Sequence, residues 1–452
     1  MTQSETQVKT AARKDAGTQG FVDILTFLIP CLQFIQVQLV GKLNGTDILI
    51  AVVFVYLAVR LRFRIAAPVG KWLLALCLVW LASQILTDIV RRSPFADYAR
   101  GWSNIGMTFA YLAVLWTLLY GRPRRIVIYG WGLVLGTILM FLISPDEGAA
   151  KYPWKFGLAR PLSLAVFLLA SRKECRGLLP IMLATVMGLI NIALGARSMG
   201  GSCLAAALYL IVNRLMRRRS AKGLKLRARS IMVFATSIIV GLAGVLWVYQ
   251  LAASQGILGE DARSEYEGQS SGRFGMLLGG RVDMLGAFAA IYDSPILGHG
   301  SWAKDPKYLL AEQQAMALMD YTNTGGISSE EMEEGIIPSH SFILGAWVDA
   351  GILGACFWVW VLVLTVKSLS RVYPPSVEIL PLVSLSAFVL LWDLLFSPYG
   401  AVMRIISTYN ILVLMTGLSL ATPAADQVLA AKLKRPIKAV SKRKSLGESA
   451  RA

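Results

Sequence analysis

The feature that most constrains this chain is a long succession of apolar stretches, most of them near twenty residues long. The hydrocarbon core of a bilayer is about 30 Å thick, and a helix needs roughly 20 apolar residues to cross it. Because 56% of the residues are hydrophobic and only 16% are charged, the chain lacks the polar residues that would cover several soluble domains. The sequence therefore predicts an all-α polytopic membrane protein with about twelve transmembrane helices, at residues 22–41, 46–63, 70–90, 101–120, 125–144, 156–171, 178–196, 200–216, 231–252, 341–366, 378–396 and 402–421.

The distribution of basic residues predicts how these helices are oriented. Cytoplasmic connections of membrane proteins carry an excess of Lys and Arg, and most of the 45 Lys and Arg fall on every second connection. Both termini are then cytoplasmic. The expected organisation is a cytoplasmic tail at 1–21, nine helices over 22–252, one large outer-side loop over 253–340, three helices over 341–421, and a basic cytoplasmic tail at 422–452.

The net charge of +18 first raises nucleic acid as a partner. The loop 253–338 holds 13 acidic and 5 basic residues, so the excess lies in the other segments, where it follows the topology. We therefore expect membrane lipid as a partner, with the basic tail on anionic headgroups, and no nucleic acid.

A few arginines fall on the outer side, against the positive-inside bias. The guanidinium group is always charged and grips two phosphate oxygens at once, so several converging arginines would bind a lipid-linked diphosphate. The alternative for each one alone is contact with lipid headgroups through a long, flexible stem. The candidates for diphosphate binding are Arg160, Arg197, Arg281 and Arg404.

The chain has two histidines, His299 and His340. His340 lies where the long loop returns to the membrane, and a neutral imidazole there can take a proton from an attacking hydroxyl. The alternative is an interfacial histidine at a helix start, and His299, between two glycines, is expected to be structural. The acidic residues of the loop are expected to be solvated rather than to bind metal.

Two stretches of the second half of the chain carry a resemblance. They are GGRVDMLGAFAAIYDSPILGHGSW, which starts with Arg281 after two glycines, and IIPSHSFILGAWVDAGILG, which contains His340. With the short turn ALGARSMGG around Arg197, they resemble the motifs of the O-antigen ligase and O-antigen polymerase superfamily. Departures from the family pattern are Ser341 in place of a common Asn, Asp349 in place of Glu, and Ala196 in place of Ser.

The resemblance implies a GT-C-like membrane glycosyltransferase of the bacterial inner membrane, with its active site facing the periplasm. Such an enzyme transfers a glycan from undecaprenyl diphosphate to an acceptor hydroxyl. The acceptor is a sugar of the lipid A core in lipopolysaccharide ligases and another repeat unit in polymerases of surface polysaccharide or exopolysaccharide. The resemblance implies that Arg281 and His340 are catalytic, that Arg197 and Arg281 bind the diphosphate, and that neither nucleotide nor metal is required.

A transporter or flippase of lipid-linked sugars or of another polar solute is the main alternative. About twelve helices with cytoplasmic termini suit many carriers, but carriers commonly have internal repeats and charged, broken helices near the midplane. The spans of this chain carry few midplane charges, with Asp393 as the main exception. A structural partner in an envelope complex is a third possibility, and it would not need the ordered Arg and His motifs.

Overall fold

The computed structural model describes most of the chain between residues 19 and 421. The described residues are 19–38, 42–65, 67–175, 177–221, 244, 250–256, a few positions within 259–270, 284–320, 335–337 and 339–421. The predicted span 231–252 lies almost entirely outside these residues, and so does Arg281.

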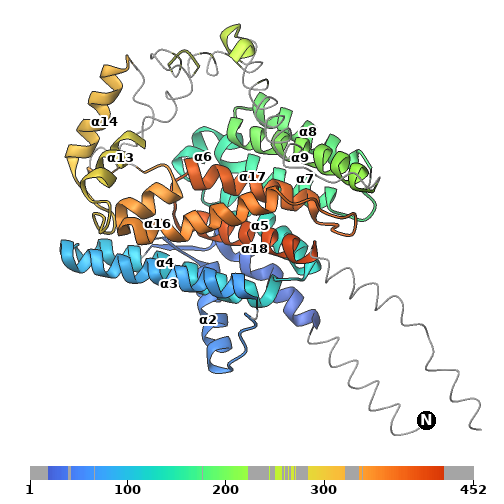
Figure 1. Cartoon of the computed structure of the whole chain (residues 1–452), viewed down its shortest axis with the longest axis horizontal. Coiled ribbons are helices and arrows are strands. Elements are labelled where there is room, and N and C mark those ends of the chain that lie inside the picture. Colours follow the sequence, from blue (N-terminus) through green and yellow to red (C-terminus); the bar gives the residue numbers. More distant parts are fainter. Residues whose placement is uncertain are drawn as a thin grey trace, which may run out of the picture.

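The described chain is almost entirely helical (Figure 1). An apolar helix over Gln19–Phe34 ends in the 3-10 turn η1 (Leu32–Phe34). The elements that follow are β1 (Gln36–Gln38), β2 (Lys42–Asn44), α2 (Gly45–Val59), α3 (Pro68–Arg91), α4 (Phe95–Leu119), α5 (Pro123–Ile143), α6 (Glu147–Lys151), the π-helix η2 (Pro153–Leu158), α7 (Ala159–Ala170), α8 (Leu179–Ala193), α9 (Arg197–Ala221), α13 (Met284–Asp293), α14 (Pro306–Leu318), α16 (Phe342–Leu369), α17 (Leu380–Phe396) and α18 (Ala401–Leu420).

Six of these helices are long and apolar enough to cross a membrane, by length and composition: α3, α4, α5, α9, α16 and α18. They coincide with six of the predicted spans. Four other predicted spans coincide with shorter apolar helices, at Gln19–Phe34, Gly45–Val59, Leu179–Ala193 and Leu380–Phe396. The span predicted at 156–171 is a twelve-residue helix, α7, preceded by the π-helix η2.

The first predicted span, 22–41, is wrong at its C-terminal end. The helix stops at Phe34, and the chain turns into a two-stranded antiparallel hairpin in which Gln36 faces Asn44 and Gln38 faces Lys42. Alternating polar side chains favour an extended strand over a lipid-facing helix at this point. The following helix begins with a capping box, because the Asn44 backbone N–H donates to Asp47 Oδ2 at 2.9 Å.

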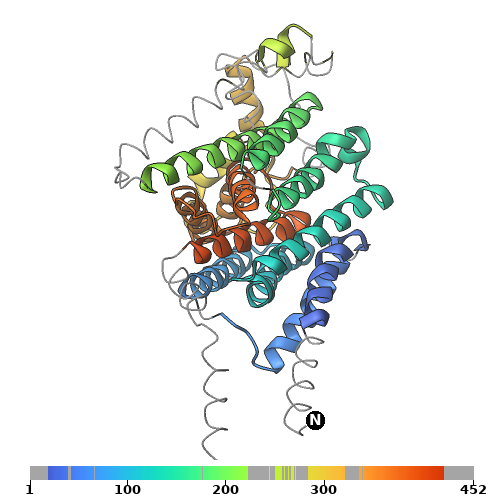
Figure 2. The ribbon, with the colours of Figure 1, turned by 90° about the vertical axis from the view of Figure 1, so that its right-hand side faces the viewer.

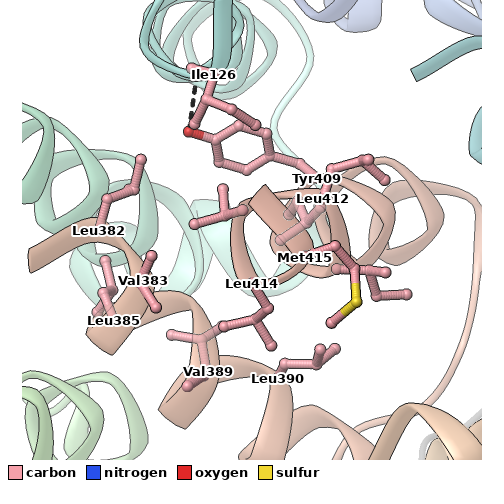
Figure 3. Packing of buried hydrophobic residues seen from close by; sticks show 14 of the residues in the cluster. Ile126, Leu382, Val383, Leu385, Val389, Leu390, Tyr409, Leu412, Leu414 and Met415 are labelled. Atoms are coloured by element: carbon pink, nitrogen blue, oxygen red, sulfur yellow. Dashed lines mark hydrogen bonds between the residues drawn. The ribbon is translucent and has the colours of Figure 1, made fainter. Parts of the chain in front are cut away.

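The C-terminal helices form the centre of the bundle. In Figures 1 and 2, α16, α17 and α18 lie between α3 and α4 on one side and α7 to α9 on the other. All residues of α18 from Arg404 to Gly417 are buried, as expected for a helix surrounded by others. Figure 3 shows side chains of α17 and α18 packed together, with the Tyr409 hydroxyl donating to the Ile126 carbonyl of α5 at 3.2 Å.

Candidate functional site

A buried ion pair joins the start of α7 to the end of α17. The two terminal nitrogens of Arg160 each donate to one oxygen of Asp393, both at 3.1 Å. The Asp393 side chain is fully buried, whereas 34% of the Arg160 side chain is exposed. Ser397 Oγ also donates to Asp393 Oδ1, at 2.9 Å. The carboxylate accepts from two of the five guanidinium N–H groups. Arg160 is therefore held in one orientation while part of its side chain stays accessible.

A small polar cavity lies beside this pair, where the first turns of α7 and α9 meet the last turns of α17. Its volume is about 50 Å³, which is room for a few water molecules. Polar and charged side chains form much of its lining: Lys155, Arg160, Ser198, Ser202, Trp392 and Asp393. Arg197, the first residue of α9, directly precedes the lining residue Ser198 and is half-buried. Of the four predicted arginines, Arg160 therefore lines the cavity, and Arg197 is next in sequence to another lining residue.

His340 is brought to the same corner by its neighbour. Ser341 is the N-cap of α16 and accepts a hydrogen bond from the Leu344 N–H at 3.2 Å. The Ser341 hydroxyl in turn donates to the Leu394 carbonyl at 2.8 Å. Leu394 follows Asp393, so this bond fixes the start of α16 against the turn of α17 that holds Arg160. His340 is half-buried there.

Helix α16 is broken at Gly351, whose backbone has φ 66° and ψ −167°. A break in a helix leaves carbonyl and N–H groups without their usual partners. The loop 295–300 supplies them: His299 N donates to Val348 O at 2.7 Å, Gly300 N donates to Asp349 O at 3.0 Å, and Ile352 N donates to Pro295 O at 3.1 Å. Two segments about fifty residues apart therefore form one unit.

Glycine is required on both sides of this contact. A Cβ on Gly351 would overlap the carbonyl oxygen of Ile296, and a Cβ on Gly298 would lie 2.5 Å from the Gly351 nitrogen. Both residues also have positive φ, which is costly for residues with a side chain. His299 lies in the same loop with its Nε2 2.8 Å from the Ala290 carbonyl oxygen, and its ring meets Tyr308 edge to face.

One face of α3 holds this unit from the other side. The Asp88 carboxylate accepts five hydrogen bonds. Four come from Ser93 Oγ, the Ser301 N–H, Ser301 Oγ and the Trp102 indole, at 2.7–2.8 Å, and a longer one comes from Gln84 Nε2 at 3.4 Å. Arg91 donates to the Gly298 carbonyl at 3.0 and 2.9 Å and to Ser294 at 2.8 Å. Asp88 is buried, so its oxygens accept hydrogen bonds from protein donors rather than from water.

These α3 residues were not predicted as a group from the sequence. The sequence does contain a pattern that indicates them: polar residues spaced three and four apart inside an apolar span. Residues with this spacing share one face of a helix. The polar residues are Ser83, Gln84, Thr87, Asp88 and Arg91. Ser83 Oγ donates to the Ala350 carbonyl at 2.7 Å, next to the break in α16.

Arg404 does not join Arg160 and Arg197. Its guanidinium donates to Asp47 Oδ1 and to Asn104 Oδ1, both at 2.7 Å, and lies over the Tyr111 ring. The Arg404 side chain is only 5% exposed, and that of Asp47 is 1% exposed. A buried carboxylate requires a paired charge, and Arg404 supplies it to Asp47. Because the guanidinium of Arg404 is occupied in connecting α18 to α2 and α4, we do not include Arg404 in the proposed site.

The segment formed by α13 and α14 packs against the broken helix. The Asp293 carboxylate, at the end of α13, accepts from Lys307 Nζ at 2.5 Å and from the Tyr308 hydroxyl at 2.9 Å. The Lys307 hydrogen bond lowers the pKa of Asp293, and the same bond raises the pKa of Lys307. Burial, followed by the bond to Asp293, raises the pKa of Tyr308 to about 12. These bonds hold α14 against α13.

Arg281 and most of the acidic loop residues lie outside the described residues. In the part of the chain that the structure describes, no group of three or more His, Cys, Asp or Glu side chains could hold a metal ion. The five cysteines have free thiols.

No protein-family model matches this chain. A search of curated proteins likewise finds no match.

Proposed function

We propose that this protein is a membrane glycosyltransferase that transfers a glycan from undecaprenyl diphosphate to an acceptor sugar hydroxyl. The transfer would be of the O-antigen ligase type, onto the lipid A core, or of the polymerase type, onto another repeat unit. The observation that carries the proposal is the corner formed by Arg160, Asp393 and the start of α16, where Ser341, the residue after His340, donates a hydrogen bond to Leu394, the residue after Asp393. A proton acceptor and a phosphate-binding group are the two functions that this transfer needs.

In the proposed reaction, the acceptor oxygen attacks the anomeric carbon of the lipid-linked sugar. A new C–O bond forms, the bond from that carbon to the diphosphate oxygen breaks, and undecaprenyl diphosphate leaves with the electron pair. His340 takes the proton of the attacking hydroxyl on a ring nitrogen. The arginines stabilise the charge that develops on the diphosphate, which is commonly the largest contribution to catalysis.

The donor diphosphate is assigned to Arg160 and Arg197 at the cavity, and to Arg281 by its place in the family-like motif. Asp393 keeps the Arg160 guanidinium in one orientation, so that little side-chain freedom is lost when a phosphate binds. Lys155 and Arg160 give the lining of the small cavity two positive charges, against the one negative charge of Asp393. This excess of positive charge favours the binding of an anion. The enzyme would act in the bacterial inner membrane at its periplasmic face, with a GT-C-like fold.

The interlocking of loop 295–300 with α16 supports the proposal independently. The two segments carry the two halves of the resemblance, and the described contacts join them at Gly298 and Gly351. The loop follows directly on α13, the helix that begins three residues after Arg281.

Substitutions in a strain that lacks the native gene test the proposal. His340→Ala, Arg281→Ala and Arg197→Ala are each expected to abolish the surface polysaccharide and to cause lipid-linked glycan to accumulate. Arg263→Ala is a matched control, because this outer arginine is exposed and pairs with Glu267. If the His340 and Arg281 variants make normal polysaccharide at normal protein abundance, the proposed site is wrong.

The glycan pattern of the deletion strain separates the two types of transfer. Single repeat units that remain attached to the acceptor would indicate a polymerase, whereas acceptor without any attached glycan would indicate a ligase.

A flippase or transporter is favoured by one observation, the break in α16, since broken helices are common at transporter binding sites. In this structure the loop 295–300 takes up the backbone groups that a substrate would otherwise contact. Transport of a lipid-linked glycan breaks no bond and needs no proton acceptor. Full transport of a labelled lipid-linked glycan by His340→Ala vesicles, without glycan transfer by the unsubstituted protein, would establish the alternative.

A further inference from the structure

A second cavity lies at the opposite ends of the helices that form the candidate site. The candidate site uses the starts of α7, α9 and α16 and the end of α17, whereas this cavity uses the ends of α7 and α9 and the start of α17. The loop between α7 and α8 and the loop between α16 and α17 complete its walls. Its volume is about 610 Å³, within the range of roughly 300–1,000 Å³ that is usual for ligand pockets.

The lining of this cavity is strongly basic. Five cationic side chains, Arg172, Lys173, Arg214, Arg217 and Arg218, oppose the single carboxylate of Glu378. Arg214 Nη1 is buried and has no hydrogen-bond partner among the described residues. Crowding of like charges is unfavourable unless an anion neutralises them, and a buried N–H without an acceptor adds to this cost. The cavity is therefore suited to an anionic ligand.

The walls of the cavity are fixed by specific bonds. Asn213, next to Arg214, exchanges two hydrogen bonds with the Tyr373 backbone, at 2.8 and 3.2 Å. One turn earlier, the Tyr209 hydroxyl donates to the Arg371 carbonyl at 2.7 Å. These bonds hold the loop between α16 and α17 against α9. The basic side chains of α9 that line the cavity, Arg214, Arg217 and Arg218, therefore lie beside a wall that these bonds hold in place.

Two helix starts add to the positive potential. Pro180 of α8 and Pro381 of α17 line the cavity, and each occupies one of the first two positions of its helix. Neither helix start receives a hydrogen bond from the side chain of its N-cap residue. Uncapped helix N-termini carry a partial positive charge and donate to phosphate oxygens.

We propose that this cavity binds a phosphate group, carried by the headgroup of an anionic phospholipid or by a free phosphate compound. The positive-inside distribution of basic residues assigns this end of the bundle to the cytoplasmic side, and basic pockets between helices on that side are suited to anionic lipid headgroups. The ligand would stabilise the ends of α7 and α9 and the start of α17, at the end of the bundle opposite the candidate site. The proposal does not depend on the transfer reaction.

The test is native mass spectrometry of the full chain purified in detergent and titrated with phosphatidylglycerol, phosphatidylcholine or inorganic pyrophosphate. We expect Arg214→Gln/Arg217→Gln to bind the phosphate ligand roughly thirtyfold more weakly than the unsubstituted protein. Arg60→Gln/Arg62→Gln, which removes two exposed arginines from another connection on the same side, is the matched control and is expected to bind normally. Arg172→Gln/Arg218→Gln repeats the test from other positions in the cavity, in case the first variant does not fold.

Each outcome decides the proposal. Tighter binding of phosphatidylglycerol than of phosphatidylcholine, with no binding of pyrophosphate, assigns the cavity to a lipid headgroup. Binding of pyrophosphate that the cavity variants lose assigns it to a free phosphate compound. Equal binding of both lipids without pyrophosphate binding, or equal loss in the control and the cavity variants, overturns the proposal.

Discussion

Asp393 and Arg160 form a two-point ion pair in which the carboxylate is fully buried and the guanidinium is partly exposed. The two residues come from α17 and α7, 233 positions apart in the chain. Both residues line the small polar cavity, together with Ser198 and Ser202 of α9. The orientation of the Arg160 guanidinium, which binds phosphate in the proposed site, therefore depends on Asp393.

Removal of one partner of this pair is expected to destabilise the protein. Arg160→Leu leaves the buried Asp393 carboxylate without its cation, and such losses cost about 3–5 kcal/mol. The double variant Arg160→Leu/Asp393→Leu removes both charges and should recover most of this stability. Thermal unfolding in detergent measures both. Equal melting temperatures of the single and double variants would show that the pair contributes no charge compensation.

Gly351→Ala is expected to detach the loop 295–300 from α16. The new Cβ would overlap the Ile296 carbonyl oxygen in addition to the strain of a positive φ. Gly121→Ala is the matched control, because Gly121 has a similar φ of 70° and open space around its Cα. The control should lose only about 1–2 kcal/mol, from backbone strain. Proteolysis of residues 284–320 measures the difference, and equal protection in both variants would contradict the interlocked arrangement.

Asp88→Ala is expected to loosen the contact between α3 and the loop after Gly300. The substitution leaves the donors of Ser93, Ser301 and Trp102 without their acceptor, and each unsatisfied buried group costs about 1–3 kcal/mol. Asp88→Asn retains one acceptor oxygen and should be milder. Hydrogen exchange at the Ser301 amide reports the contact directly. Unchanged exchange in the alanine variant would rule out this role of Asp88.

The attachment of α14 to α13 is expected to depend on pH. The lowered pKa of Asp293 means that its contribution is present above its unfolded pKa of about 4 and is lost as pH falls through the folded value. The raised pKa of Lys307 means that its contribution is present below its unfolded pKa of about 10 and is lost as pH rises through the folded value. Protection of α14 from proteolysis should be greatest between these limits.

Asp293→Asn provides the control for this pH dependence. The variant should have weaker protection at neutral pH and no further loss in acid. A loss in acid that is identical in the variant and the unsubstituted protein would mean that another group is responsible.

Arg404→Leu is expected to lower stability rather than donor binding. The substitution leaves Asp47 buried without its cation, which costs about 3–5 kcal/mol. Arg404→Leu/Asp47→Leu should recover stability and retain the affinity for a lipid-linked diphosphate. Loss of that affinity in the stable double variant would return Arg404 to the binding site.

The class of fold could be predicted from the sequence, because it depends on local composition. In lipid, every backbone polar group must be satisfied within its own segment or by buried protein, so an apolar run of about twenty residues forms a helix. This reasoning places α3, α4, α5, α9, α16 and α18 close to their predicted positions. It fails after Phe34, where a short polar alternation forms a hairpin inside a predicted span.

The candidate site could be predicted only in part. His340 and Arg197 could be predicted as candidates because each interrupts apolar surroundings, which is a local signal. The polar face of α3 was a local signal as well, but its contacts with the loop 295–300 span more than 200 residues. The break at Gly351 could not be predicted from the sequence, because the loop 295–300, distant in the chain, supplies the missing hydrogen-bond partners.

The sequence by itself determined that this chain forms apolar helices, with a few arginines near their ends. It could not distinguish Arg160 from Arg404, since both are arginines near the start of a predicted span. The tertiary structure decided this, because the environment of each guanidinium comes from residues distant in the chain. Asp393 leaves Arg160 partly exposed at a polar cavity, whereas Asp47 and Asn104 enclose Arg404 in the bundle.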